Sequence, residues 1–373
     1  TGTLTITNSS VGGNFAASTS GGGIVLGSAG DLTVGGNSSF TANGAGGLVN
    51  LADLVSTGTV TFNTIGDATL TKGGGIRLAA STVGGTLNAT ASTGTITDEG
   101  TLTIANSNFT ANGAGGGIVL DQLVASGVLT ANTGGSVALT SGQNLRVGTS
   151  TSGGTFDVTV DAGSTIRLQG GLTSGGDMTF NGLRTRLVSD NGLTTSGDDI
   201  LFNTRVAVDG TDVAIGTAGG NLTFTDLVDG NTAGTNGMTI DLGTGDLLFD
   251  RSVGTDVQLG NVNVDNARNL TVNGAFGARG IGASNNGRAQ LSGSATFNGS
   301  INASGNAGQD GGDKQSADRD IGDDAEDDEQ ETGRDEHAQD RAPCDNAHGE
   351  ACRVAVALHL RHGDAREDRR GCD

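Results

Sequence analysis

The sequence predicts an all-β fold, a right-handed parallel β-helix, and three observations carry this prediction. Phenylalanine recurs at nearly constant intervals, the residues around it alternate between apolar and polar, and the chain has 68 Gly but one Pro. A large side chain repeated at a fixed period is typical of a solenoid, in which each coil adds one such side chain to a continuous core. We expect about thirteen coils of 21–27 residues followed by a disordered C-terminal tail.

The phenylalanines define the period. The eleven copies lie at positions 15, 40, 62, 109, 156, 180, 202, 224, 249, 276 and 297, and the two longest intervals are about twice the others. Alignment of the flanking residues places Leu87 in the first long interval and Ala131 in the second. The sequence therefore predicts thirteen equivalent side chains, 21 to 27 residues apart, stacked one above another.

Two strands are predicted in most coils. In residues 60–63 the aliphatic residue and Phe point to one face and the Thr between them points to the other, which is the period of a strand. A second strand with two aliphatic residues follows about eleven residues later, as in residues 24–26 and 118–120. A third, less regular strand is predicted in some coils, as in residues 102–104.

Near-identical stretches at residues 37–63 and 106–132 lie 69 residues apart, which we interpret as three coils. Helix is disfavoured, because Gly in a helix interior costs roughly 1 kcal/mol relative to Ala. The Gly runs, such as residues 115–117, precede a strand and not a helix, so they are predicted corners and not phosphate-binding loops.

A change of composition divides the chain into two regions. Residues 1–308 contain 21 acidic and 11 basic residues and no Cys, His, Pro, Trp or Tyr. Residues 309–373 contain 20 acidic and 9 basic residues, all three Cys, all four His and the one Pro. We assign residues 1–308 to the parallel β-helix and residues 309–373 to an acidic low-complexity tail that we expect to be disordered.

Three interpretations of this tail stay open. It is a genuine acidic disordered segment, a small metal-binding module, or repeat DNA translated in a shifted frame, which explains the sudden loss of every repeat residue type. The spacing of its plausible metal ligands matches no familiar zinc pattern. These candidate ligands are Cys344, His348, Cys352, His359 and His362.

Composition and charge exclude several classes of function. A net charge of −21 and an almost complete lack of Lys disfavour nucleic acid as a partner, since nucleic acid is bound through cationic groups. No run approaches the roughly 18 apolar residues of a transmembrane helix, so we expect no transmembrane segment. The chain opens inside a repeat, and we expect it to be a fragment or mature internal piece of a longer protein.

Carboxylates about one coil apart are the candidate catalytic groups of the alternative function, a polysaccharide lyase or hydrolase. Asp directly after a strand is also an ordinary bend residue, and the chain lacks the Trp and Tyr of most sugar-cleaving grooves. We therefore predict that the protein is not an enzyme, and we assign no catalytic, cofactor-binding or metal-binding residue. The candidates considered are Asp226, Asp229, Asp246 and Asp250, and Asp198 and Asp199 with Asp209 or Asp212.

Thr-x-Thr pairs, such as Thr59 and Thr61, suggest an ice-binding surface as a further alternative. The pairs do not recur at one place in every coil, and Thr is an ordinary outward-facing strand residue. We therefore do not favour ice binding.

The Gly-rich coils with aliphatic-Thr-Phe-Asn strands, and the Asn-Leu-Thr-Val strand at residues 269–272, resemble filamentous haemagglutinin-family exoproteins and related autotransporter-like β-strand repeat proteins. The resemblance covers about residues 1–308, and the family's secretion domain has no counterpart in this sequence. It implies a stalk or adhesin segment of a large secreted or surface-displayed bacterial protein that mediates attachment. The implied partners are surface glycans or proteins of host or neighbouring cells and an outer-membrane secretion protein, and the implied location is extracellular or outer-membrane associated.

Overall fold

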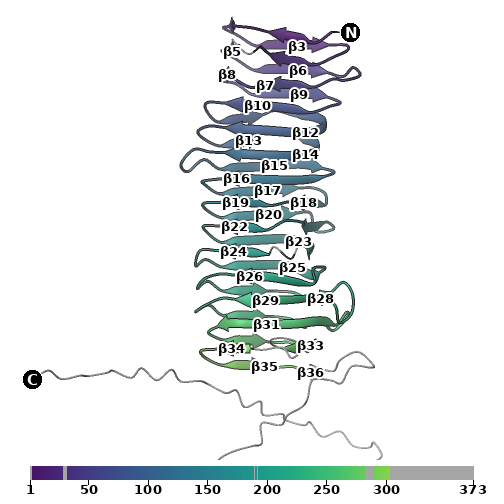
Figure 1. Cartoon of the computed structure of the whole chain (residues 1–373), viewed down its shortest axis with the longest axis vertical. Helices are drawn as coiled ribbons and strands as arrows, with labels where there is room; N and C mark the ends of the chain where they lie inside the picture. The colour runs from purple at the N-terminus through teal and green to yellow at the C-terminus, as the bar shows by residue number, and fades with distance from the viewer. Residues whose placement is uncertain (1, 28–31, 189, 191, 282–288, 303–373) are drawn as a thin grey trace, which may run out of the picture. The chain divides into compact units, whose positions relative to one another are not determined.

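The computed structural model describes residues 2–27, 32–188, 190, 192–281 and 289–302. Within these residues all regular structure is β-strand, and the strands pair in parallel with the strands of the next coil. They stack as a solenoid of about thirteen turns, so the predicted all-β parallel β-helix is confirmed (Figure 1). None of the described segments is a helix of the length and apolar character that crossing a bilayer requires.

The proposed tail, residues 309–373, and its five candidate metal ligands lie outside the described residues. The strands that the structure describes are two to eleven residues long. They are β1 (Leu4–Ile6), β2 (Ser9–Val11), β3 (Phe15–Thr19), β4 (Ile24–Leu26), β5 (Leu32–Val34), β6 (Ser38–Ala42), β7 (Val49–Leu51), β8 (Leu54–Ser56), β9 (Val60–Thr64), β10 (Ala68–Lys72), β11 (Ile76–Leu78), β12 (Ser81–Ala91), β13 (Ile96–Asp98), β14 (Leu102–Ala111), β15 (Ile118–Ala125), β16 (Val128–Thr133), β17 (Val137–Ser141), β18 (Leu145–Val147), β19 (Ser150–Ser152), β20 (Phe156–Val160), β21 (Thr165–Leu168), β22 (Leu172–Ser174), β23 (Met178–Leu187), β24 (Leu193–Thr195), β25 (Ile200–Val208), β26 (Asp212–Gly216), β27 (Leu222–Phe224), β28 (Val228–Gly230), β29 (Gly237–Asp241), β30 (Leu247–Phe249), β31 (Leu259–Ala267), β32 (Leu270–Val272), β33 (Phe276–Ile281), β34 (Ala289–Leu291), β35 (Ala295–Phe297) and β36 (Ile301–Asn302).

The strands anticipated from the alternation of side chains are present. The Phe strand of residues 60–63 is β9, the second strands at residues 24–26 and 118–120 are β4 and the start of β15, and the third strand at residues 102–104 opens β14. Their apolar residues are buried and the residues between them are more exposed, for example in the buried-exposed-buried pattern of β5 and β7. The period of two therefore separates core from surface as predicted.

In-register pairing joins each coil to the next. One row of opposed residues steps along the chain by 19 to 25 residues at a time, from Leu4 to Ile24, Val49, Ala68 and Leu87. Strands paired in this way lie about 4.8 Å apart. Identical positions in neighbouring coils are therefore held next to each other along the whole stack.

The phenylalanines are not all equivalent, which corrects the expectation of thirteen equivalent positions. They occupy several different rows: Phe40 opposes Phe62, Phe109 lies between Ala89 and Ala131, Phe156 opposes Met178, Phe276 opposes Val253, and Phe180 begins a separate row. Ala131 opposes Phe109 as predicted, but Phe156, the next predicted position, opposes Val137 and not Ala131. Leu87 does not oppose Phe109, because Ala89, two residues later, is the partner of Phe109.

The row that begins at Phe180 contains the most regular aromatic stack. Phe180, Phe202, Phe224 and Phe249 oppose one another on four successive coils. Their ring centroids are 4.9, 5.0 and 5.0 Å apart, the rings are nearly parallel, and each side chain is buried. Burial of each ring contributes about 1.5–3 kcal/mol, and an aromatic pair adds about 0.5–1.5 kcal/mol beyond its buried area.

The interior also contains a row of hydroxyl groups that the sequence pattern did not reveal. Thr133, Ser152, Ser174 and Thr195 oppose one another at a corner of successive coils, and Thr217 continues the row. Their hydroxyls donate to main-chain oxygens of the adjoining turn, as Ser174 does to Gly154 at 2.6 Å. The hydroxyls thereby satisfy carbonyl groups that the bend removes from the ladder.

Glycine forms the corners where neighbouring coils approach closely. Gly192 has φ +69°, a left-handed conformation, and a Cβ there would lie 1.8 Å from the carbonyl oxygen of Ala214 in the next coil. No side chain other than hydrogen fits this position without a backbone shift. The Gly runs at residues 21–23, 73–75 and 115–117 likewise form bends and turns that lead into strands, as predicted.

We predict that Phe202→Ala destabilises the solenoid by about 3–5 kcal/mol, because it removes a fully buried ring between two stacked neighbours. The measurement is urea unfolding of the full chain followed by circular dichroism. The matched control is Leu183→Ala on the surface of β23, where the side chain is 51% exposed and the change should stay within about 0.5 kcal/mol. Equal effects of the two substitutions would contradict the assigned core.

Candidate functional site

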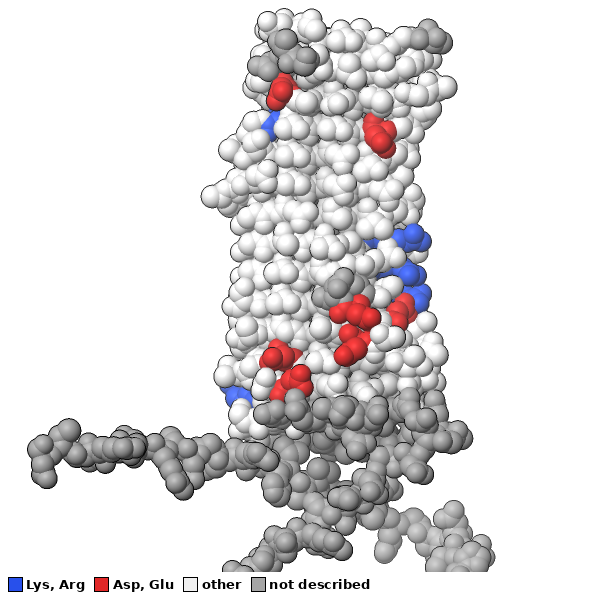
Figure 2. Space-filling model, viewed as in Figure 1, with Lys and Arg blue, Asp and Glu red and all other residues white. Residues whose placement is uncertain are grey.

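Five arginines gather on the outer surface of four neighbouring coils. Arg146 of β18 opposes Arg167 of β21, which opposes Arg186 of β23, and Arg184 of β23 opposes Arg205 of β25. Arg184 and Arg186 are two residues apart on one strand and so point to the same side. We call these five residues the arginine patch. Figure 2 shows Lys and Arg side chains grouped at the right margin of the solenoid, above a group of Asp and Glu.

One end of the arginine patch is neutralised by carboxylates. The guanidinium of Arg186 pairs with Asp209 at 2.6 Å, and that of Arg205 pairs with Asp256 at 2.7 Å and Asp229 at 3.2 Å. Asp229 is buried, and its other oxygen accepts the main-chain N–H of Asp256. These ion pairs therefore fasten the loop after β30 to the outer surface of β25 and β28.

The other end of the arginine patch has no counter-charge. Within the part of the chain that the structure describes, Arg146, Arg167 and Arg184 form no ion pair and no hydrogen bond. Arg146 and Arg184 are exposed and Arg167 is half-buried. The Nε atom of Arg167 is buried without a partner. Two opposed arginines, Arg146 and Arg167, and the neighbouring Arg184 thus have no paired carboxylate in a chain whose net charge is −21.

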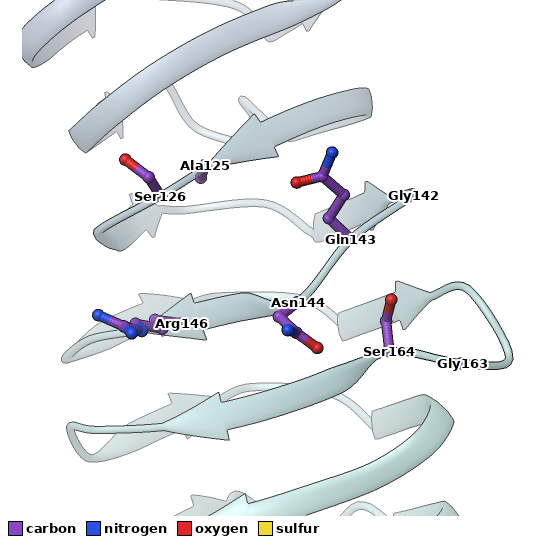
Figure 3. Close-up of a pocket in the computed structure, with 8 residues that line it drawn as sticks. All are labelled: Ala125, Ser126, Gly142, Gln143, Asn144, Arg146, Gly163 and Ser164. Atoms are coloured by element: carbon purple, nitrogen blue, oxygen red, sulfur yellow. The ribbon is translucent and has the colours of Figure 1, made fainter.

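A polar pocket adjoins this free end. Its volume is about 380 Å³, and Arg146 is part of its wall. Neutral groups supply the rest of the lining: Ala125, Ser126, Gly142, Gln143, Asn144, Gly163 and Ser164. Figure 3 shows Ser126 and Arg146 on one side, Gln143 and Ser164 on the other, and Asn144 between them. Guanidinium, amide and hydroxyl groups therefore meet at one place on the surface.

One hydrogen bond between coils and one within a turn hold the pocket in shape. The side-chain oxygen of Asn144 accepts the main-chain N–H of Thr165 at 2.7 Å, and the N–H of Gln143 donates to the hydroxyl of Ser141. One carboxylate lies beside the pocket, because Oδ2 of Asp161 is 3.5 Å from where a Cβ on Gly142 would be. The amide NH2 of Asn144 and the side chain of Gln143 make no hydrogen bond within the described residues and face solvent.

The first set of candidate carboxylates is engaged in structural contacts. Asp226 accepts the N–H of the next residue at 2.7 Å, and Asp229 belongs to the ion pairs of Arg205. Asp246 pairs with a guanidinium, and Asp250 accepts an amide hydrogen of Asn273 at 2.8 Å. These contacts join neighbouring residues or neighbouring coils, which is the role of a bend residue.

The second set of carboxylates is similar. Asp199 accepts the N–H of Asn221 at 2.7 Å, Asp209 pairs with Arg186, and Asp212 accepts the hydroxyl of Thr239 at 2.8 Å. For Asp198 the contact is made by its main-chain carbonyl, which accepts the hydroxyl of Thr195. The prediction that the protein is not an enzyme stays a prediction, since none of these contacts measures turnover.

Asp and Asn oxygens form a chain of links across the coils. The N–H of Asp199 donates to Asp177, the N–H of Asn221 donates to Asp199, and the N–H of Asp246 donates to Asn221. The next coil continues the series, since the amide of Asn269 donates to Asp246 and its oxygen accepts the N–H of Ser294. Each side chain thus satisfies a turn N–H one coil further along.

Electrostatics alter the pKa of a few groups. The Arg268 guanidinium and the Asn269 amide hold the pKa of Asp246 below its ordinary value. Burial raises the pKa of Asp98, although the N–H groups of two later residues oppose the shift by donating to it. Burial also lowers the pKa of Lys72, whose Nζ donates to the carbonyl of Ser56 at 2.9 Å. The described residues hold no group of three or more His, Cys, Asp or Glu suited to a metal ion.

The arginine patch was not among the predicted sites, although the sequence contains a signal for it. Arg146, Arg167 and Arg186 follow one another at intervals close to one coil, as Arg184 and Arg205 do. A search for any residue type repeated at the coil period, and not only for Phe, finds these positions. The pocket had no such signal, because its lining comes from three turns of ordinary composition.

The comparisons with known proteins identify repeats without assigning a function to them. A family model described as repeats of unknown function (DUF5649) matches residues 65–132 and 134–189. Together the two matches cover about a third of the chain, from the end of β9 to just after β23, and the second includes Arg146, Arg167, Arg184 and Arg186. No curated protein and no solved structure matches the chain. The chain is therefore similar to a repeat family over the coils that carry most of the arginine patch.

We predict that Asp199→Ala lowers the free energy of unfolding by about 0.5–1.5 kcal/mol, because the N–H of Asn221 loses its acceptor. The conservative variant Asp199→Asn keeps an oxygen at the same position and should differ little from the original chain. Urea unfolding compares the three proteins. Equal losses in the two variants would show that the carboxylate charge matters and the hydrogen bond does not.

We predict that Arg268→Gln raises the pKa of Asp246 toward its ordinary value of 3.8. Because the folded-state pKa is depressed, the ion pair stabilises the fold above the unfolded-state pKa, and this contribution is lost as pH falls through the lower folded value. A carboxyl titration of chain labelled at Asp measures the pKa directly. Arg77→Gln, which removes a distant ion pair with Glu99, serves as the control and should leave Asp246 unchanged.

Proposed function

We propose that this chain is a structural segment of a large secreted or surface-displayed bacterial exoprotein of the filamentous haemagglutinin-like kind. In this role the solenoid acts as a stalk that holds binding surfaces away from the cell and mediates attachment. The observation that carries the proposal is the stack of parallel-paired coils that the described residues form between β1 and β36. At about 4.8 Å per coil, thirteen turns extend roughly 60 Å.

The side chains that join the coils support a mechanical role. The aromatic row of Phe180, Phe202, Phe224 and Phe249 gives neighbouring coils a shared core, and the Asp and Asn chain fastens their turns. In a solenoid each coil contacts only its neighbours, so stiffness depends on every such interface. The candidate carboxylates contribute to these interfaces, which favours support over catalysis.

The test of this proposal is attachment. Beads coated with the purified full chain are expected to bind bacterial cells and cultured epithelial cells, and soluble chain should compete for that binding. Beads coated with Phe202→Ala chain that has been unfolded by heat are the matched control, since they carry nearly the same composition without the solenoid. A parallel assay with acidic and neutral polysaccharides measures turnover.

Two results would refute the proposal. Coated beads that bind no better than the unfolded control would exclude attachment by this segment. Polysaccharide turnover that is lost in Asp226→Asn or Asp250→Asn would show that the chain is an enzyme.

A further inference from the structure

We propose that the free end of the arginine patch and the adjoining pocket bind the carboxylates of an acidic polysaccharide. The site consists of Arg146, Arg167 and Arg184 with Gln143 and Asn144. The inference deepens the attachment role proposed above and rests on it. It names the chemical class of the partner and the coils that contact it.

The positive charges at the free end of the arginine patch have no paired carboxylate within the described residues. Backbone register forces Arg146 and Arg167 to lie opposite each other about 4.8 Å apart, and like charges opposed in this way are destabilising. The remaining arginines show that the fold can supply counter-charges, since Asp209, Asp229 and Asp256 neutralise Arg186 and Arg205. The guanidinium groups at the free end are therefore available to bind an anion from another molecule.

The arginines at the free end are arranged along the stack of coils. Arg146 and Arg167 lie opposite each other on adjacent coils, and Arg184 lies on the next coil beside their row, whose third member Arg186 pairs with Asp209. A guanidinium matches a carboxylate with two parallel hydrogen bonds. A linear polymer with regularly repeated carboxylates fits such a row better than a single small anion does.

The pocket beside the free end is lined by neutral hydrogen-bonding groups. Hydroxyl and amide groups of Ser126, Gln143, Asn144 and Ser164 line it next to the guanidinium of Arg146. These neutral donors and acceptors suit sugar hydroxyls, which accompany carboxylates in a uronic acid chain. The described phenylalanines are largely buried in the core, so recognition at this surface depends on polar contacts and not on stacking.

The experiment measures binding of the full chain to polygalacturonate by calorimetry at low salt, with neutral dextran as the uncharged comparison. We expect binding to polygalacturonate that weakens steeply as salt is added, as for other polyanions. The triple variant Arg146→Gln, Arg167→Gln, Arg184→Gln should bind on the order of tenfold more weakly, or worse. Asp161→Asn should bind more tightly, because it removes the carboxylate beside the pocket.

The matched control is a triple variant of equal net charge, Arg77→Gln, Arg251→Gln, Arg268→Gln, which should keep the affinity of the original chain. Thermal unfolding of both triple variants is measured alongside, and the patch variant should not lose stability, since it relieves repulsion. If the patch variant loses binding and also has a lower Tm, its loss of binding could come from unfolding. Asp161→Asn then decides, because it must increase affinity for polygalacturonate if the proposal holds.

Several results would overturn the inference. If the control triple variant lowers the affinity for polygalacturonate equally, the attraction is a non-specific effect of net charge. If dextran binds equally well, the site does not recognise carboxylates. Binding of dextran sulfate in preference to polygalacturonate would show that the anion is a sulfate, and preference for polyglutamate would indicate an acidic protein. Attachment of beads to cells together with no polyuronate binding refutes this inference alone, whereas failure of attachment with intact polyuronate binding refutes the proposed function alone.

Discussion

The parallel backbone ladder between consecutive coils is the constraint on which the rest of this structure depends. Each strand donates to and accepts from the strand one coil away, so a residue can move only together with the positions above and below it. The consequence is that any feature repeated at the coil period becomes a row in space. The Phe stack, the interior hydroxyls, the Asp and Asn links and the arginine patch are four such rows.

The period and the strands were predictable from the sequence, but the assignment of each Phe to a row was not. Pairing carries Thr41 to Asn63, Thr82 and Thr103, so three coils there take 62 residues. The repeated stretches are 69 residues apart and therefore overshoot three coils by seven residues. Phe109 consequently lies six residues beyond Thr103 in β14, in a different row from Phe40. Coil length varies with the turns, and only the pairing of the strands fixes where each residue falls.

The candidate site was less predictable than the fold for a related reason. Acidic residues after strands were candidate catalytic groups, because glycoside-cleaving enzymes use paired carboxylates. The contacts of Asp199, Asp226 and Asp250 are instead those of bend residues. The arginines carried the coil period in the sequence. What the sequence did not contain is which of them have partners, because Asp229 in β28 and Asp209 and Asp256 in loops are brought to the patch only by the fold.

The same ladder makes a row of unpaired charges both costly and useful. Strand pairing fixes the Cα atoms of Arg146 and Arg167 opposite each other, so only rotation of the two side chains can move their guanidinium groups apart. The repulsion is spread over coils whose cores are otherwise well packed, with Leu145, Val147, Ile166 and Leu168 buried beneath the patch. Buried aliphatic rows on the inner face thus offset a fixed electrostatic cost on the outer face. Because the backbone beneath the row is already ordered, binding of a repeating polyanion as proposed above would need to order only the arginine side chains.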